Sequence, residues 1–378
     1  MVPFNIPYIS GDEQALVEDA IRRKNLSGEG YYTKACQERL ADFTGASRVL
    51  LTPSCTHALE LSALLLNLQA GDEVIMASFT FVSTANAFVL RGATPVFVDI
   101  RPDTMNIDER LIEKAINSKT KAIVVMHYAG VACEMDTIMA LADKYGLIVI
   151  EDAAQCVDTY YKGRHLGTIG HFGTFSFHST KNIHCGEGGA LLINEAKFIE
   201  AAEVIREKGT NRNQFLRGEV DKYSWVNIGS SILMGELNAA FLYAQLDKIK
   251  EVSTQRLALW EQYRQGLTNL PPEIQVPIIP ENCQHNGHMF YLKCKDIRER
   301  QLLIDHFKQG GITASFHYVP LHTAPAGQRF GRFDGDDHFT TKESERLLRL
   351  PLYFDLQALE QICDQAINFF AIHESKSS

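Results

Sequence analysis

Short apolar runs alternate with helical patterns between about residues 47 and 195, and this alternation most constrains how the 378-residue chain can fold. The runs are rich in β-branched residues, and several are apolar on both faces, as is typical of strands covered by helices on both sides. We expect strands at residues 48–51, 73–75, 95–99, 122–127, 147–152, 174–177 and 190–194. Because helical patterns at 56–68, 108–116 and 135–145 lie between them, the sequence predicts an α/β fold with a large, mostly parallel sheet.

A long helical pattern from Gly235 to about Leu267 leads into a different arrangement. Beyond it we expect a strand at 288–293, a helix at 298–308, a strand at 313–318 and two closing helices at 341–348 and 356–370. The sequence therefore predicts two domains, a large α/β domain over residues 1–250 and a small α+β domain over residues 251–378.

Composition excludes several classes of protein. The formal net charge of −9 argues against bulk nucleic-acid binding, which needs a basic surface. No apolar run approaches the roughly 18 residues that a membrane span needs. The first residues lack the basic and apolar regions of a signal peptide. The 8 cysteines form no CxxC pair, so we expect reduced thiols in a cytoplasmic protein without a metal site.

Lys181 is the first candidate for chemistry. It follows the strand predicted at 174–177 and precedes a glycine-rich turn at 186–189. A lysine in a partly dry pocket has a lowered pKa and can act as a nucleophile or form a Schiff base. Glycines let the backbone approach a flat ligand closely. The alternative is an ordinary surface lysine.

Asp152 is the second candidate, at the end of a very apolar strand. A buried carboxylate is costly unless it meets a cation or strong donors, and a protonated ring nitrogen would serve. Glu151 and Asp152 point to opposite faces of the strand, so only one of them can face a given ligand. The alternative is an aspartate that caps the following turn.

The turn at 52–58 follows a strand and opens a helix, where backbone N–H groups and the hydroxyls of Ser54 and Thr56 would hold a phosphate. It contains neither common nucleotide fingerprint, and an ordinary capped helix is the alternative. Phe81 would stack on a planar ring or serve as a core aromatic. Among the histidines, whose spacing matches no zinc site, we expect His317 to face a cleft.

These pieces occur in a characteristic order: the phosphate-type turn, the aromatic, Asp-Ala-Ala-Gln at 152–155, a serine five residues before Lys181, and Gly-Glu-Gly-Gly at 186–189. In this the chain resembles the DegT/DnrJ/StrS sugar aminotransferases, pyridoxal-phosphate (PLP) enzymes with the aspartate-aminotransferase fold (PLP fold type I). The likeness runs from residue 2 to residue 352.

The resemblance implies a role for each matching position. Lys181 corresponds to the Schiff-base lysine and Asp152 to the carboxylate that pairs with the pyridinium nitrogen. Cofactor contacts are further implied for Gln155 near the ring hydroxyl, for Phe81 against the ring, and for Thr56, the backbone at Cys55 and Ser176 around the phosphate. His178, where family members vary, and His317 are the candidates for substrate binding.

One motif departs from the family. Many members have Gly-x-Asn-x-Arg-Met, whose Asn reaches the cofactor phosphate of a partner subunit. Here Ser231 replaces the Asn and Leu233 the Arg. We still expect a homodimer with shared active sites, in which the contact is weaker, bridged by water, or made by Asn227.

The resemblance also implies a reaction. It predicts that dTDP-4-keto-6-deoxy-D-glucose becomes dTDP-4-amino-4,6-dideoxy-D-galactose, with L-glutamate as amino donor and pyridoxamine phosphate (PMP) as the intermediate cofactor form. Lysine at position 181 excludes the related sugar 3-dehydratases, which have histidine there. An equatorial 4-amine, a 3-amine product, and a non-catalytic PLP-fold sensor remain as alternatives.

Overall fold

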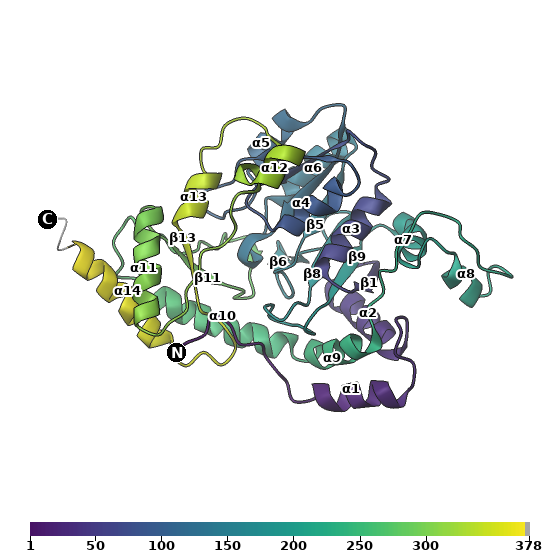
Figure 1. Cartoon of the computed structure of the whole chain (residues 1–378), viewed down its shortest axis with the longest axis horizontal. Helices are drawn as coiled ribbons and strands as arrows, with labels where there is room; N and C mark the ends of the chain where they lie inside the picture. Colours follow the sequence, from purple (N-terminus) through teal and green to yellow (C-terminus); the bar gives the residue numbers. More distant parts are fainter. Residues whose placement is uncertain (375–378) are drawn as a thin grey trace.

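A central eight-stranded sheet organises the computed structural model, which describes residues 1–374 (Figure 1). Its strand order is β1-β9-β8-β5-β4-β2-β3-β12. β9 runs antiparallel to β1 and β8, and the other neighbouring pairs are parallel. The predicted α/β class with a mostly parallel sheet is confirmed. The strands are β1 (Arg48–Thr52), β2 (Glu73–Ala77), β3 (Thr94–Val98), β4 (Thr120–Met126), β5 (Ile148–Asp152), β8 (Phe172–Ser176), β9 (Gly189–Ile193) and β12 (Arg332–Phe333).

Both faces of this sheet are buried, which explains the near-continuous apolar runs in its strands. In β1, Val49 and Leu51 belong to one core cluster, whereas Leu50 belongs to the cluster on the other face. The connecting helices cover these faces. They are α3 (Cys55–Leu65), α4 (Val82–Val89), α5 (Glu109–Ala115), α6 (Met135–Tyr145) and α7 (Ile199–Arg206).

Local signals fix the ends of these helices. The Asp108 carboxylate accepts a hydrogen bond from the Arg110 N–H and so caps the start of α5. Gly146 ends α6 with φ of 65°, a left-handed conformation that favours glycine. Short 3-10 turns lie at Tyr128–Gly130, Ala196–Phe198 and Leu321–Thr323.

The predicted long helix after Gly235 is wrong in one respect, because it is two helices, α9 (Glu236–Leu246) and α10 (Ile249–Gly266). Because of the break at residues 247–248, the two helices pack against different neighbours. α9 packs on α1 (Glu13–Arg22) and α2 (Tyr31–Thr44), whereas α10 continues into the C-terminal part, where it packs on α14 (Leu359–Glu374).

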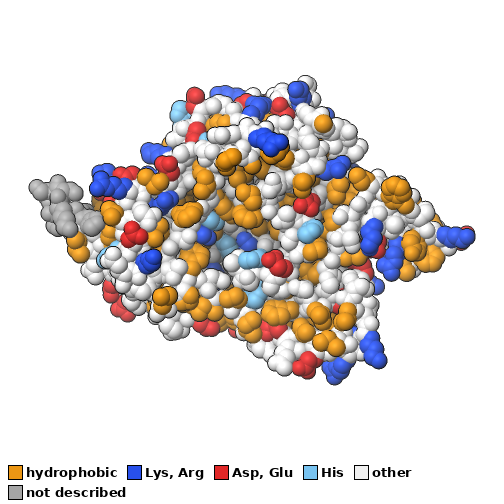
Figure 2. All heavy atoms as spheres, in the orientation of Figure 1, with side chains coloured by type: hydrophobic (Ala, Val, Ile, Leu, Met, Phe, Trp, Pro, Cys, Tyr) orange, Lys and Arg blue, Asp and Glu red, His pale blue; other side chains and the backbone are white. Residues whose placement is uncertain are grey.

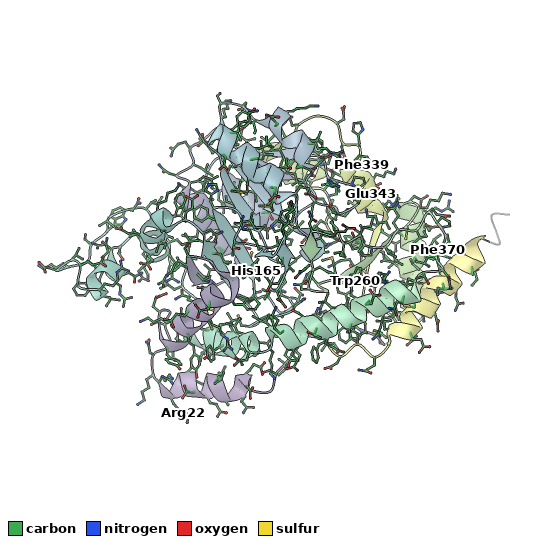
Figure 3. All side chains as sticks on the ribbon, turned by 180° about the vertical axis from the view of Figure 1, so that it is seen from behind. Arg22, His165, Trp260, Phe339, Glu343 and Phe370 are labelled. Carbon is green, nitrogen blue, oxygen red and sulfur yellow. The ribbon has the colours of Figure 1, made fainter. Side chains whose placement is uncertain are left out.

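A separate core forms in the C-terminal part, around the antiparallel pair β11 (Phe290–Lys293) and β13 (Leu347–Leu350). The helices α10, α11 (Ile297–Gln309) and α14 pack around it. Figure 3 labels Trp260 on α10 and Phe370 on α14, both of which are buried in this core.

Two predictions in this part are wrong. Residues 313–318 form no strand: Ser315 makes a single bridge with Arg349, and His317 and Tyr318 line a cavity. The helix predicted at 341–348 ends early. α13 (Thr340–Arg346) stops where Leu347 begins to pair with Lys293 in the small sheet.

The chain crosses between the two parts several times, and the domain boundary at residue 250 stays a prediction. α10 spans that point, with Val252 in one core and Leu259 in the other. β10 (Cys283–Gln284) pairs with β6 (Tyr160–Tyr161), which in turn pairs with β7 (Arg164–His165). The remaining helices are α8 (Arg212–Leu216) and α12 (Pro325–Phe330). Within residues 1–374, no helix is long and apolar enough to cross a membrane.

Candidate active site

A cavity of about 720 Å³ lies at the carboxyl ends of β5 and β8, where ligands of open α/β sheets bind. Histidine and basic side chains are visible in the central hollow of the molecule (Figure 2). The structure brings nearly all sequence-predicted site residues to this cavity. Its lining includes Cys55, Thr56, Phe81, Asp152, Gln155, Ser176, His178, Lys181 and His317.

Asp152 ends β5 with its carboxylate held in place. The Thr84 hydroxyl donates to Oδ2 at 2.6 Å, and the Ala154 N–H donates to Oδ1 at 3.2 Å. Burial raises the pKa of Asp152 because the charged form loses water without gaining a full counter-charge. A protonated ring nitrogen would supply that charge. Glu151 faces away, as predicted from strand alternation, and accepts backbone N–H groups of Gly167, Ile169 and Gly170.

Lys181 lies across the same cavity, in the turn after β8. Burial is the main reason that its pKa lies below the ordinary lysine value. Within the described chain, its ammonium group forms no ion pair, so the amine is available to a carbonyl ligand. A lowered pKa makes the neutral, nucleophilic amine easier to reach near neutral pH.

The start of α3 offers an anion site. Ser54 caps the helix through the His57 N–H, and the hydroxyls of Thr56 and Ser83 lie 2.8 Å apart. Gly189 of β9 runs directly against this turn, and a Cβ there would overlap with the backbone of Ser54 and Cys55. A helix N-terminus with free N–H groups and hydroxyls suits a phosphate.

An amide and several aromatic side chains also line the cavity. The Gln155 amide accepts from the Ala129 N–H at 2.7 Å and donates to the Tyr318 hydroxyl at 3.1 Å. His317 stacks on Tyr318 with ring centroids 3.7 Å apart, and burial holds its pKa well below the ordinary histidine value. Phe81 is 54% exposed at the cavity edge, as a residue that stacks on a bound ring would be.

The hydrogen bonds of His288 fix its tautomer. The Asn182 amide nitrogen donates to the Asn286 carbonyl, so its oxygen must accept from His288 Nδ1 at 3.0 Å. Burial keeps the pKa of His288 well below its ordinary value. The neutral ring therefore keeps Nε2 as an acceptor for a ligand hydroxyl, and His288 lines the cavity.

Sequence reasoning missed His288, Tyr318, Arg256 and Arg349, which also line the cavity. They come from α10 and the C-terminal part, and no local motif marks them. His178 is half-buried at the rim, with Nε2 3.7 Å from Glu187 Oε1.

Ser231 does not reach the cavity of its own chain. It is exposed in the segment after α8, and its backbone bridges to Glu207. Its predicted role therefore needs a second subunit and stays a prediction.

Comparison with known proteins identifies the family to which this chain belongs. The sequence profile described as the DegT/DnrJ/EryC1/StrS aminotransferase family matches residues 7–366. This chain belongs to the DegT/DnrJ/EryC1/StrS aminotransferase family. Membership confirms the resemblance inferred from the cofactor motifs, and with it the predicted enzyme class.

Solved structures of aminotransferases share the fold over almost the whole chain. The aminotransferase TlmJ from Streptoalloteichus hindustanus has a TM-score of 0.91 at 27% identity, covering 99% of this chain and 100% of that one. The putative sugar aminotransferase Spr1654 from Streptococcus pneumoniae, in its PLP-form, has a TM-score of 0.87 at 26% identity, covering 99% of each chain. Helicobacter pylori PseC, an aminotransferase involved in pseudoaminic acid biosynthesis, has a TM-score of 0.88 at 25% identity, covering 98% of this chain and 99% of PseC.

The DegT/DnrJ/EryC1/StrS aminotransferase family depends on PLP, and Spr1654 is also known in its PMP-form. The predicted cofactor is confirmed. The side chains present in the cavity suit it, since an oriented carboxylate, an unpaired lysine and a helix N-terminus match the ring nitrogen, the aldehyde and the phosphate of PLP.

Proposed function

We propose that this sugar aminotransferase converts dTDP-4-keto-6-deoxy-D-glucose to dTDP-4-amino-4,6-dideoxy-D-galactose, with L-glutamate as amino donor. The observation that supports a catalytic function is that Lys181, Asp152 and the start of α3 line the same cavity. The choice of sugar is supported by the likeness of residues 51–56, 79–92, 127–141 and 340–350 to dTDP-4-amino-4,6-dideoxygalactose transaminase. That enzyme makes the aminosugar nucleotide used for enterobacterial common antigen.

Asp152 and Lys181 have different roles in the proposed catalysis. When bound, PLP supplies a carbonyl for the incoming amine and an electron-accepting ring. Asp152, held by Thr84, keeps a proton on the ring nitrogen. Lys181 Nζ would hold the cofactor at rest. During the reaction, Nζ would take the proton from the α-carbon of the donor and, in the second half-reaction, deliver one to C4 of the sugar.

We also propose that the enzyme works as a homodimer. The segment around α8 projects from the body of the molecule (Figure 1). It exposes several large apolar side chains: Phe215 (40%), Leu216 (62%), Tyr223 (53%), Trp225 (80%), Val226 (53%) and Ile228 (49%). An apolar patch on a projection favours burial against another chain, and a second copy would also bring Ser231 or Asn227 to a neighbouring cofactor phosphate. Light scattering should give twice the chain mass, and Trp225→Ser should shift it toward the monomer; a monomeric wild type contradicts the dimer.

The position and orientation of the amine in the product test the proposed function. NMR of the compound formed from dTDP-4-keto-6-deoxy-D-glucose, L-glutamate and purified protein should show an axial amine at C4. An equatorial amine would keep the mechanism and change the product. No amine from this sugar, with glutamate still converting PLP to PMP, would redirect the search to another keto sugar. Failure of glutamate to convert PLP, for several donors, would favour a sensor.

Lys181→Ala tests the central residue. We expect a folded protein that neither transaminates nor shows the visible absorption band of lysine-bound cofactor, whereas exposed Lys162→Ala retains both. Persistence of that band in Lys181→Ala would mean that a different lysine binds the cofactor.

A further inference from the structure

His288, just before β11, is held by hydrogen bonds from its ring and from its backbone. Its Nδ1–H donates to Oδ1 of Asn182 at 3.0 Å, and the Asn182 amide nitrogen donates to the Asn286 carbonyl at 3.1 Å. The His288 carbonyl accepts from Nη2 of Arg256 on α10 at 2.7 Å. Because Asn182 directly follows Lys181, these contacts fix the imidazole ring against the turn that carries Lys181.

The other ring nitrogen of His288 is left as a hydrogen-bond acceptor. Within residues 1–374, no group forms a hydrogen bond with Nε2, and the side chain lines the cavity. Burial, followed by the positive charges of Lys181 and Arg256, keeps the pKa of His288 well below its ordinary value, so the ring is neutral. A neutral ring with its proton on Nδ1 only accepts at Nε2. The cavity therefore presents a fixed, unpaired acceptor that needs a donor from a ligand.

Few groups of the two substrates can donate to this acceptor. The carboxylates of glutamate and the diphosphate of the nucleotide sugar only accept, and the glutamate amine is the group that reacts. The sugar of the proposed function has hydroxyls at C2 and C3 only, since C4 is a carbonyl and C6 is a methyl group. C3 is bonded directly to C4, the carbon that Lys181 must reach. An acceptor held against the turn of Lys181 therefore suits the C3 hydroxyl.

We infer that His288 Nε2 accepts a hydrogen bond from the C3 hydroxyl of the sugar, an inference that rests on the proposed function. The guanidinium groups of Arg256 and Arg349 also line the cavity, but they only donate. His288 then selects among sugars, since a substrate without a donor at C3 leaves this acceptor unpaired in the occupied cavity. Asn182 is a positioning residue for this selection, because its amide fixes which ring nitrogen carries the proton.

Binding without chemistry provides the first test. dTDP-4,6-dideoxy-D-xylo-hexose has no keto group and carries hydroxyls at C2 and C3, so calorimetric titration of the PMP-form reports recognition alone. We expect wild type to bind the counterpart without the C3 hydroxyl about tenfold or more weakly. His288→Leu removes the acceptor, so it should bind these two ligands within about threefold of each other. The counterpart without the C2 hydroxyl is the matched ligand control, and His288→Leu should not change the cost of losing that hydroxyl.

Further variants separate the acceptor from the packing of the ring. His288→Gln places an amide oxygen near the position of Nε2 and should keep part of the preference for the C3 hydroxyl. His288→Asn is too short to place an acceptor there, and it carries the same test if the Leu variant does not fold. The control variant is His338→Gln, at a side chain that is 71% exposed, which should bind all three ligands like wild type.

Half-reactions provide the second test. In the reaction of the PMP-form with 4-keto sugars, loss of the C3 hydroxyl should lower the second-order rate constant about tenfold or more in wild type, but less than about threefold in His288→Leu. Conversion of PLP to PMP by glutamate should stay within about threefold of wild type in the same variant, because glutamate offers no hydroxyl.

The outcomes are distinct. Equal discrimination at C3 in wild type and His288→Leu would overturn the inference, as would a loss that follows the C2 hydroxyl instead. A comparable loss in the glutamate half-reaction would also overturn it, since His288 would then act on a step that both substrates share. If wild type converts PLP with glutamate but forms no amine from the keto sugar, the proposed function fails instead.

Discussion

The Thr84 hydroxyl donates a 2.6 Å hydrogen bond to Asp152 and itself lies 2.9 Å from the Thr80 hydroxyl. Because Asp152 Oδ2 accepts from Thr84, the Thr84 oxygen is left to accept from Thr80. A short chain of hydroxyls from α4 and the turn before it thus aims the carboxylate at the end of β5. The helix after β2 thereby orients a group on a strand two positions away in the sheet.

Asp152→Asn should slow transamination on the order of 10²-fold or more, since a neutral amide no longer stabilises a proton on the cofactor ring. Steady-state turnover with saturating glutamate and sugar measures this. Thr84→Val keeps the shape but loses the hydrogen bond, so we expect a smaller loss, about tenfold. Near-normal turnover in Asp152→Asn would remove Asp152 from its role.

Gly189→Ala should weaken PLP binding about tenfold or more, because its Cβ overlaps with the backbone of Ser54 and Cys55 and must push the start of α3 away. The matched control is Gly235→Ala, whose Cβ would meet only ordinary contact, 3.7 Å from the Leu26 carbonyl. Fluorescence titration of the apo-proteins with PLP compares them. Equal affinities would show that the anion site does not depend on this contact.

Glu151 should contribute a pH-dependent part of the stability. His127 and three backbone N–H groups hold the pKa of this buried carboxylate below 4.5, despite the opposing effect of burial. A carboxylate whose pKa is lowered in the folded state stabilises the protein at pH values above its ordinary pKa of 4.5. That stability is lost as the pH falls through the pKa of the folded state.

Denaturant unfolding at several pH values between about 7 and 3 checks this. Glu151→Gln should be less stable than wild type near neutral pH and should lose less stability as the pH is lowered. Parallel pH profiles for the two proteins would rule out the contribution of Glu151.

The buried ion pair of Lys293 and Glu343, 2.9 Å apart, should be costly to break. Glu343 is labelled in Figure 3 on α13, and both side chains are at most 4% exposed. Glu343→Gln leaves a buried ammonium without a counter-charge, so we expect the free energy of unfolding to fall by about 3–5 kcal/mol.

The comparison pair is Lys144 and Glu113 on the surface, with side chains 61% and 47% exposed. Glu113→Gln should change the free energy of unfolding by less than about 1 kcal/mol. Equal effects in chemical denaturation would contradict the difference that burial predicts.

The sheet was predictable because its strands are apolar on both faces, a pattern typical of strands covered by helices on both sides. Boundaries fell within a few residues where a local signal exists, as at Asp108 and Gly146. The failures lie where tertiary contacts decide. Residues 313–318 have strand-like composition, but His317 and Tyr318 line a cavity, and Leu347 leaves its helix because Lys293 offers a pairing edge.

The candidate site divides in the same way. Asp152 and Lys181 follow strands, so their convergence could be anticipated from the rule that ligands bind at strand ends. His288 and Arg349 lie next to β11 and in β13, far along the chain from both, and only the packing of the C-terminal part brings them to the cavity. Ser231 does not reach the cavity of its own chain, so the role predicted for it depends on a second subunit.

The position of β12 has a consequence for biosynthesis. Residues 332–333 pair in parallel with Val96 and Phe97 and complete the edge of a sheet whose other strands have all been made by residue 193. A nascent chain thus carries β3 with its outer edge unpaired while residues 194–331 are still being added. An open strand edge is a template for pairing with other chains. Truncation before β12 would expose that same edge permanently, so shortened chains should aggregate even though the motifs around Asp152 and Lys181 are intact.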